Sequence, residues 1–158
     1  MKIKNKFQIY SDESNYNTGR FRSIAAISGK KNNLKEVQKK LSKELDKYNI
    51  TEVKWGGVKS HYPKIKAAYQ FIEVLFNYIL KNELRVDIII WDTHDFRHDI
   101  KNRDDKTNFE IMYYNLLRHI SSRYKNYVWD FFPDKQSMIN WENSVSYTHL
   151  TLPTKRIV

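Results

Sequence analysis

Stretches with the apolar spacing of strands alternate along this chain with stretches that have helical spacing, and this order constrains the fold most strongly. Strand patterns predict extended segments at Lys6 to Ser11, Phe21 to Ser28, Thr51 to Trp55, Val86 to Trp91 and Tyr127 to Phe132. Helical patterns predict helices at Leu34 to Tyr48, Pro63 to Asn82 and Phe109 to Tyr124, with another helix opening near Ser137. The first two strands form a hairpin and the later ones are joined through helices. We therefore expect an α/β fold, a mixed sheet with helices on both faces.

Two apolar stretches predict deep burial. Val86 to Trp91 is nearly continuous in apolar residues, interrupted only by Asp87, which is typical of a central strand buried on both faces. The helix from Pro63 to Asn82 has a broad apolar stripe, so we expect it to be well covered.

The size and composition of the chain predict a single globular domain in the cytoplasm. Its 158 residues fall within the usual size of one domain, and 41% of them are hydrophobic. The absence of cysteine suits a reducing compartment. No stretch approaches the roughly 20 apolar residues of a membrane span, so no membrane partner is expected.

Positive charge favours a polyanionic partner. The chain holds 28 Lys and Arg and 18 Asp and Glu, a formal net charge of +10, and nucleic acid is the first candidate. Lysines recur at every fourth position from Lys31 to Lys47, and Lys35, Lys39 and Lys43 are candidate nucleic-acid-binding residues. The alternatives are a charge that serves solubility and a solvated helix face.

Acidic residues stand where two predicted strands end. Asp12 and Glu13 follow the first strand, and Asp134 follows the strand from Tyr127 to Phe132, within which Asp130 is the competing acid. Strand ends are where ligands bind in open α/β sheets, and carboxylates at a rim can hold a hard cation. The alternatives are an ordinary turn at Asp12 and a helix cap at Asp134.

Glu52 and Lys54 lie two positions apart on a predicted short strand, so their side chains are expected to share a face. A carboxylate beside an ammonium suits phosphate chemistry, because one can ligate Mg²⁺ while the other offsets developing charge. The alternatives are an ion pair on an edge strand and a restriction-endonuclease-like core, in which the strand of Lys54 would be central.

The loop after the predicted strand Val86 to Trp91 is rich in Asp and His. Because His94 and His98 would share a face on a helix, a zinc site is one interpretation, although a solvated loop is the usual one. Asp92, directly after the strand, is a candidate lining residue for the site.

Several of these motifs resemble a known family. Tyr10-Ser11-Asp12-Glu13-Ser14 resembles the strand-end "DESG" signature of the domain-of-unknown-function family 3800, with Asn15 in place of its glycine. Glu52-Val53-Lys54-Trp55 resembles the "E-x-K-W" element of that family, and Asp134-Lys135-Gln136-Ser137 resembles its "D-x-x-S" turn better than Asp130 fits it. The resemblance covers Lys6 to about Trp141.

This family is similar to ribonuclease-H-like nucleases. The resemblance implies a ribonuclease-H-like fold and a phosphodiesterase that uses Mg²⁺ or Mn²⁺, with Asp12 and Asp134 as metal ligands. Asp12, Glu13, Glu52, Lys54 and Asp134 would form the catalytic set. The family usually continues to a "Q-x-A-D" helix with another acid, which is missing here, so both an active enzyme and an inactive fragment are expected outcomes.

The last residues of the chain differ from the rest. Residues 144–158 resemble translated sequencing-adapter sequence, so we expect the native chain to be cut near Asn143, and a disordered tail is the alternative. Residues 1–143 are then one incomplete ribonuclease-H-like domain that lacks its last helical element. The predicted function is a metal-dependent nuclease acting on RNA or DNA, and the alternative is a non-catalytic module that binds nucleic acid or another partner.

Overall fold

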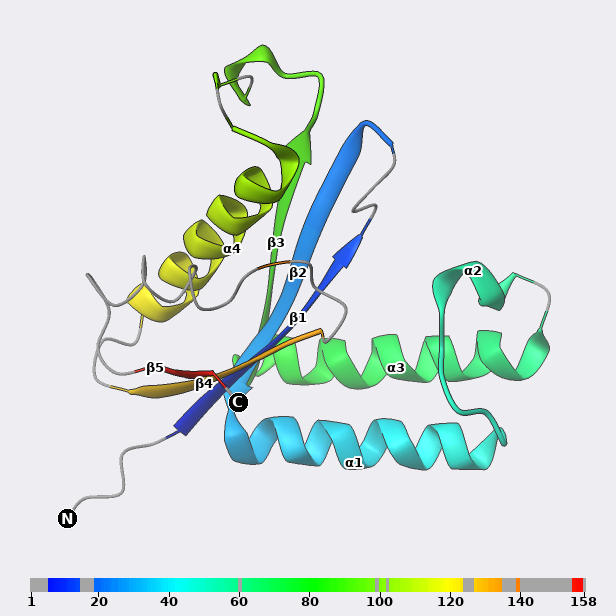
Figure 1. The fold of residues 1–158 in the computed structure, drawn as a ribbon. Helices are drawn as coiled ribbons and strands as arrows, with labels where there is room; N and C mark the ends of the chain where they lie inside the picture. The colour runs from blue at the N-terminus through cyan, green and yellow to red at the C-terminus, as the bar shows by residue number, and fades with distance from the viewer. Residues whose placement is uncertain are drawn as a thin grey trace. The chain divides into compact units, whose positions relative to one another are not determined.

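Five strands and three longer helices form the parts of the chain that the structure, a computed structural model, describes (Figure 1). The described residues are 6–14, 19–59, 61–98, 100–101, 103–123, 127–134, 139 and 155–157. They fall into two units: Met1–Ser28 with Val86–Val158, here the sheet unit, and Gly29–Arg85, here the helical insert.

The sheet is mixed, with β1 in its middle. The strands are β1 (Lys6–Ser14), β2 (Phe21–Lys30), β3 (Leu84–Asp92), β4 (Val128–Pro133) and β5 (Lys155–Ile157), in the order β3-β2-β1-β4-β5. β4 pairs in parallel with β1, from Lys6 opposite Val128 to Ser11 opposite Pro133, and β5 pairs in parallel with β4. Figure 1 shows β2 running opposite to β1 and β3, as the predicted hairpin requires.

Helix α4 (Asp105–Ser122) covers one face of this sheet. Phe7 and Ile9 of β1 point to that face because alternate strand residues point to the same side. They pack in one cluster with Phe109 of α4 and Phe131 of β4, each with at most 6% of its surface exposed. Burial of such a side chain contributes about 1.5–3 kcal/mol. The predicted helix layer on the second face stays a prediction.

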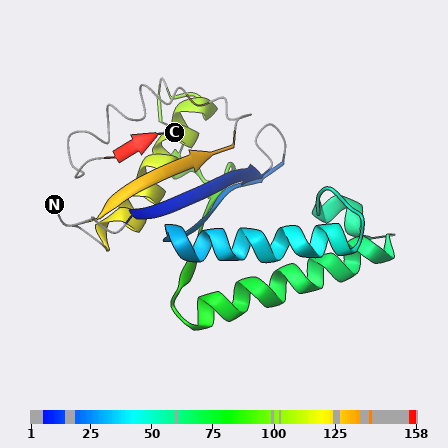
Figure 2. The ribbon, with the colours of Figure 1, turned by 90° about the horizontal axis from the view of Figure 1, so that it is seen from below.

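Two antiparallel helices dominate the helical insert. α1 (Lys31–Lys47) and α3 (Tyr62–Leu80) lie side by side in both views, and the short α2 (Trp55–Val58) connects toward α3 (Figure 2). The Tyr78 hydroxyl of α3 donates to Glu36 Oε2 of α1 at 3.1 Å, and Leu34 and Val37 are the buried residues of α1. Pro63 stands in the first turn of α3, where its missing N–H has no helical partner to lose.

The strand predicted from Thr51 to Trp55 is wrong. Residues 52–54 are irregular, and Trp55 begins α2, so Gly56 and Gly57 lie inside a helical turn rather than ending a strand. A segment of three residues has no neighbouring strand among the described residues of the insert, so it cannot form the ladder that stabilises a strand.

The predicted burial of β3 is also wrong. β3 is an edge strand in the described sheet, and Val86, Ile88 and Ile90 are 42%, 61% and 65% exposed, whereas Asp87 is buried. Trp91, of the opposite parity, belongs to the core cluster shared with α4, and Ile89 packs against that cluster. Apolar residues at every position predict two covered faces, but only one face of β3 is covered here.

Helix α3 differs from its prediction in the same way. Its buried residues Ala67, Ala68 and Tyr78 lie on one side, while exposed apolar side chains follow the other: Tyr62, Tyr69, Ile72, Phe76 and Leu80. The side toward α1 is covered and the opposite side is not. None of the described helices has the length and apolarity needed to cross a membrane.

Some predictions fall outside what the structure describes. The helix expected near Ser137 lies in residues 135–138, which are outside the described residues, as is most of the 144–158 segment. Lys155–Ile157 of that segment forms β5. The single domain over 1–143, the missing last helix and the cut near Asn143 stay predictions.

Candidate functional site at the ends of two parallel strands

Asp12 and Asp134 lie near the carboxyl ends of two neighbouring parallel strands: Asp134 follows β4, while β1 continues to Ser14, past the end predicted at Ser11. Ser11 of β1 is opposite Pro133 of β4, and the Asp134 N–H continues the ladder by donating to the Ser11 carbonyl oxygen at 3.2 Å. The next residue on β1 is Asp12, so the two acids share the register position that follows the Ser11–Pro133 pair. Both are exposed. The structure thus brings together the two residues predicted as metal ligands.

The side chains beneath Asp12 belong to the sheet face opposite α4. Tyr10 stacks on Phe132, with ring centroids 4.8 Å apart and planes 11° apart, and Gln8 is opposite Asp130. Gln8 and Asp130 are 5% and 8% exposed. Asp130, the competing acid, therefore lies inside the sheet opposite an amide, whereas Asp134 lies at the exposed rim beside Asp12.

Glu13 turns to the other face, toward α4. The Tyr113 hydroxyl donates to Glu13 Oε1 at 2.6 Å, and the Ser11 hydroxyl donates to the Tyr113 oxygen at 3.4 Å. Burial, followed by the hydrogen bond to Glu13, raises the pKa of Tyr113 well above its ordinary value of 10.0. Tyr113 therefore remains a neutral hydrogen-bond donor that fixes Glu13 behind the acid pair.

The donor set at the rim fits a hard divalent cation. Mg²⁺ prefers oxygen ligands and is commonly held by one or two carboxylates with water in its remaining positions, and Asp12 and Asp134 supply two exposed carboxylates. Among the residues that the structure describes, no three His, Asp or Glu side chains gather as a fuller metal site. The described part of the chain thus offers two carboxylates to the predicted magnesium or manganese site, which stays a prediction.

Glu52 and Lys54 belong to the helical insert. They form an ion pair, Lys54 Nζ to Glu52 Oε2 at 3.4 Å, with side chains 74% and 55% exposed, so the contact contributes little stability. The shared strand face predicted for them is wrong, because residues 52–54 are not a strand. This also removes the support for a restriction-endonuclease-like core with Lys54 on a central strand. Their place in a site with Asp12 stays a prediction.

Lys35, Lys39 and Lys43, here the lysine row, are exposed on α1. Together with Gln38, Ser42 and Asp46 they line a shallow groove of about 500 Å³. The segment that carries the lysine row is therefore helical, as its spacing predicts.

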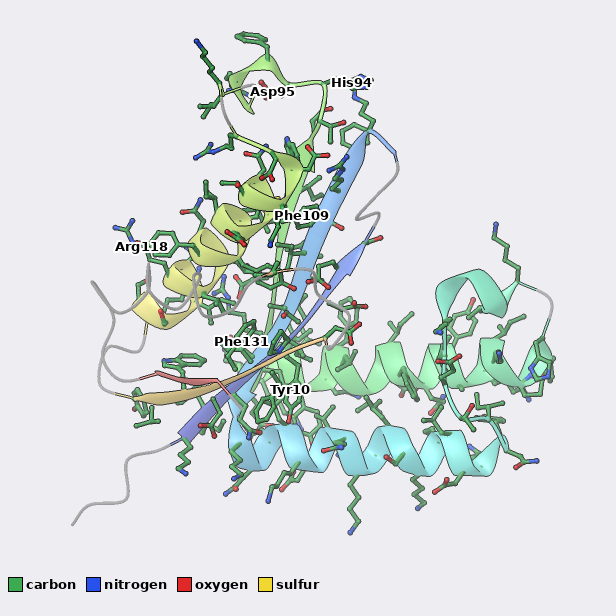
Figure 3. The ribbon with its side chains drawn as sticks, viewed as in Figure 1. Tyr10, His94, Asp95, Phe109, Arg118 and Phe131 are labelled. Atoms are coloured by element: carbon green, nitrogen blue, oxygen red, sulfur yellow. The ribbon has the colours of Figure 1, made fainter. Side chains whose placement is uncertain are left out.

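Asp92, predicted as a candidate lining residue of the site, forms an ion pair with Arg20. Arg20 donates to both of its carboxylate oxygens, with Nε–Oδ1 at 2.9 Å and Nη2–Oδ2 at 2.8 Å, which joins the end of β3 to the start of β2. The hydrogen bond from Arg20 lowers the pKa of Asp92 below its ordinary value of 3.8. Figure 3 shows His94 and Asp95 in the loop after β3, well apart from Tyr10 and Phe131. This loop is consistent with the solvated interpretation, and among its described side chains no zinc cluster forms.

Sequence reasoning missed the role of Tyr113. Its position in the apolar stripe of a helix indicates a core residue, and it is fully buried. Nothing local signals that its hydroxyl contacts Glu13, because the two residues are 100 positions apart.

Comparison with known proteins gives relatives of unknown function. No family model matches the sequence. Two proteins of Methanothermobacter thermautotrophicus, described as uncharacterized proteins ORF2 and ORF2', are each 33% identical to this chain, over 163 and 144 residues. The matches cover 95% and 84% of this chain but 55% and 49% of the relatives. The chain thus spans about half the length of the curated relatives it matches.

Comparison with solved structures identifies the fold. A chain in the structure of the PCNA:RNase HII complex from Archaeoglobus fulgidus matches with a TM-score of 0.55 and 9% identity, covering 98% of this chain and 62% of that chain. At this identity the likeness concerns the fold alone. The predicted fold class is confirmed: the chain has an α/β, ribonuclease-H-like fold with a mixed sheet and helices.

Proposed function

We propose that this chain is the nucleic-acid-cleaving part of a divalent-metal-dependent phosphodiesterase. The observation that carries the proposal is the adjacency of Asp12 and Asp134 at the exposed ends of β1 and β4. The ribonuclease-H-like fold and the net charge of +10 support it. Membership of the domain-of-unknown-function family 3800, and the activity and substrate of the whole protein, are parts of this proposal.

The residues of the site have separate roles in it. Asp12 and Asp134 would hold Mg²⁺ or Mn²⁺, and such an ion, when bound, activates water and stabilises the leaving oxygen of a phosphodiester. The Glu13 N–H donates to Asp12 Oδ1 at 2.9 Å, which orients one carboxylate oxygen of the pair. Tyr113 fixes the Glu13 side chain on the opposite side of the strand. Glu52 and Lys54 are proposed as further polar residues of the site.

Cleavage assays with the Asp12→Asn and Asp134→Asn variants test the function. Labelled single-stranded and double-stranded RNA and DNA are incubated with Mg²⁺ or Mn²⁺, and Glu73→Gln, an exposed acid on α3, is the control. We expect either active-site variant to lose turnover by about 100-fold or more, as when one electrostatic stabiliser of a transition state is removed, with binding intact. Metal-dependent cleavage that survives both substitutions would contradict the assignment.

A second outcome of this assay would favour the non-catalytic alternative. Nucleic-acid binding by the parent chain, without any metal-dependent turnover, would indicate a module that binds through its charge. The excess of Lys and Arg is the observation that favours this alternative.

A further inference from the structure

The positive charge of the chain is concentrated in the helical insert. Gly29–Arg85 holds 13 Lys and Arg and 6 Asp and Glu, a net charge of +7 out of +10 for the whole chain. The sheet unit, which holds Asp12 and Asp134, has 15 Lys and Arg and 12 Asp and Glu, a net charge of +3 in a larger number of residues. The candidate cleavage site and most of the charge that would attract a polyanion therefore belong to different units.

Within the insert, the lysine row presents three cations at regular intervals. Successive members are four residues apart, which corresponds to an axial rise of about 6 Å and one cation for each helical turn. The buried positions Leu34 and Val37 lie on another side of α1. The lysine row is thus on a side of α1 that the insert itself leaves uncovered.

These lysines are not neutralised by nearby acids. In the described part of the chain, no carboxylate lies within ion-pair distance of Lys35, Lys39 or Lys43, whereas Lys47 and Lys54 have partners. Gln38 and Ser42 line the same groove and supply hydrogen-bond donors between the cations. Asp46 lies in the lining too, and its carboxylate would repel an anion there.

We propose that the lysine row binds the sugar-phosphate backbone of a nucleic acid strand, as a backbone-binding site separate from the acid pair. Repeated cations with amide and hydroxyl donors between them suit a repeated phosphate, and such contacts position a strand without reading its sequence. The proposal rests on the proposed function for the identity of the polyanion. It deepens that function by assigning binding to the insert and predicts no sequence preference in this contact.

The salt dependence of nucleic-acid binding tests this backbone-binding site without requiring catalysis. The full chain is titrated in EDTA against fluorescent single-stranded and double-stranded oligonucleotides at several salt concentrations, and log K is plotted against log salt. For the triple variant Lys35→Gln, Lys39→Gln and Lys43→Gln, the slope should become shallower by about 2 for a single strand or about 3 for a duplex, from roughly 0.7 or 0.9 per phosphate contact. The larger effect identifies the preferred form of the strand.

A matched variant separates the effect of the backbone-binding site from the effect of overall charge. Lys59→Gln, Lys81→Gln and Lys101→Gln also remove three exposed lysines, and we expect them to change the slope by less than about 1. An equal effect of both triple variants, an unchanged slope in the row variant, or no binding by the parent would each overturn the proposal. Lysine and glutamine have similar helix propensities, so circular dichroism should show unchanged folding of the row variant.

Failure of this proposal and failure of the proposed function give different results. Asp12→Asn should bind with the parental slope, because it leaves the insert unchanged. If the chain cleaves nothing but the lysine-row variant shows the predicted change of slope, the backbone-binding site is supported and the nuclease assignment is contradicted. If cleavage depends on Asp12 but the slope is the same in the parent and the lysine-row variant, the nuclease assignment is supported and the backbone-binding site is contradicted.

Discussion

The backbone N–H of Asp134 donates a hydrogen bond to the carbonyl oxygen of Ser11, at 3.2 Å. This bond extends the parallel ladder of β1 and β4 by one position beyond the last paired residues, Ser11 and Pro133. The backbone of Asp134 is thereby held beside that of Asp12. Two acidic residues that are far apart in the sequence thus become neighbours through main-chain pairing. Because this hydrogen bond joins backbone atoms, a substitution of either side chain would keep it.

A metal ion bound by these two acids should stabilise the folded chain. A ligand that binds only the folded state raises stability by about 2.7 kcal/mol at 100 times its dissociation constant, so millimolar Mn²⁺ should raise the melting temperature. We expect no such rise in Asp12→Asn or Asp134→Asn. Thermal melts of the three proteins check this, with Glu73→Gln as a control that keeps the parental response. An equal rise in all of them would place the ion elsewhere.

The raised pKa of Tyr113 predicts a loss of stability in alkali. In the unfolded chain this hydroxyl ionises near pH 10.0, whereas in the folded chain it keeps its proton beyond that value. Its contribution is therefore fully present below pH 10 and falls as the pH rises above 10, by up to about 1.4 kcal/mol per pH unit. Urea unfolding between roughly pH 8 and pH 11 should show a steeper decline for the parent chain than for Tyr113→Phe.

The same variant should lose stability at neutral pH. Removing the hydroxyl leaves Glu13 Oε1 without its donor, for an expected cost of about 1 kcal/mol. Tyr114→Phe, one position along α4, is the matched control. If both variants declined alike in alkali, the effect would not belong to Tyr113.

The lowered pKa of Asp92 predicts the opposite pH dependence. The ion pair with Arg20 stabilises the fold above the ordinary carboxyl pKa of 3.8, and this contribution is lost as the pH falls below that value. Asp92→Asn should therefore melt at a lower temperature than the parent at neutral pH, and the two should converge near pH 2. Asparagine can still accept from the His94 N–H, so the local turn is preserved. A difference that persists in acid would point to packing instead.

Gly29 marks a close backbone approach within the insert. A Cβ at this position would meet Leu84 Cδ2 at 2.5 Å and the Glu83 carbonyl oxygen at 2.9 Å, so Gly29→Ala should destabilise the chain by about 1–3 kcal/mol. Gly56 has no atom within 4 Å of such a Cβ and lies in α2, so Gly56→Ala should be neutral or stabilise slightly. Denaturant midpoints of the two variants check the contrast. Equal midpoints would mean that the backbone at Gly29 can shift freely.

Local periodicity was enough to predict most elements. Helices α1, α3 and α4 and strands β1, β2 and β4 occur where apolar spacing predicts them, because each side chain's direction depends on its own segment. The burial of β3 and α3 could not be obtained in this way. Ile88 and Tyr69 are apolar, but whether they are covered depends on elements elsewhere in the chain.

The candidate site divides along the same line. Asp12 and Asp134 were predictable because both lie near the ends of predicted strands, and parallel neighbours bring their carboxyl ends to the same edge. The strand face expected for Glu52 and Lys54 was wrong because a short apolar-polar alternation fits a strand and an irregular connection equally well. Tyr113 required the packing of α4 against β1, which no spacing in the sequence encodes.

The two ends of the helical insert lie next to each other. Gly29 approaches Leu84, and the Asn33 side-chain amide donates to the Glu83 carbonyl oxygen at 3.2 Å, so the insert closes on itself where it departs from and rejoins the strands. A segment with adjoining ends can be exchanged for a short connector or for another closed segment without altering the order of the strands on either side. The helical insert, the more basic of the two units, could therefore change in length or charge while the strands that carry Asp12 and Asp134 stay the same.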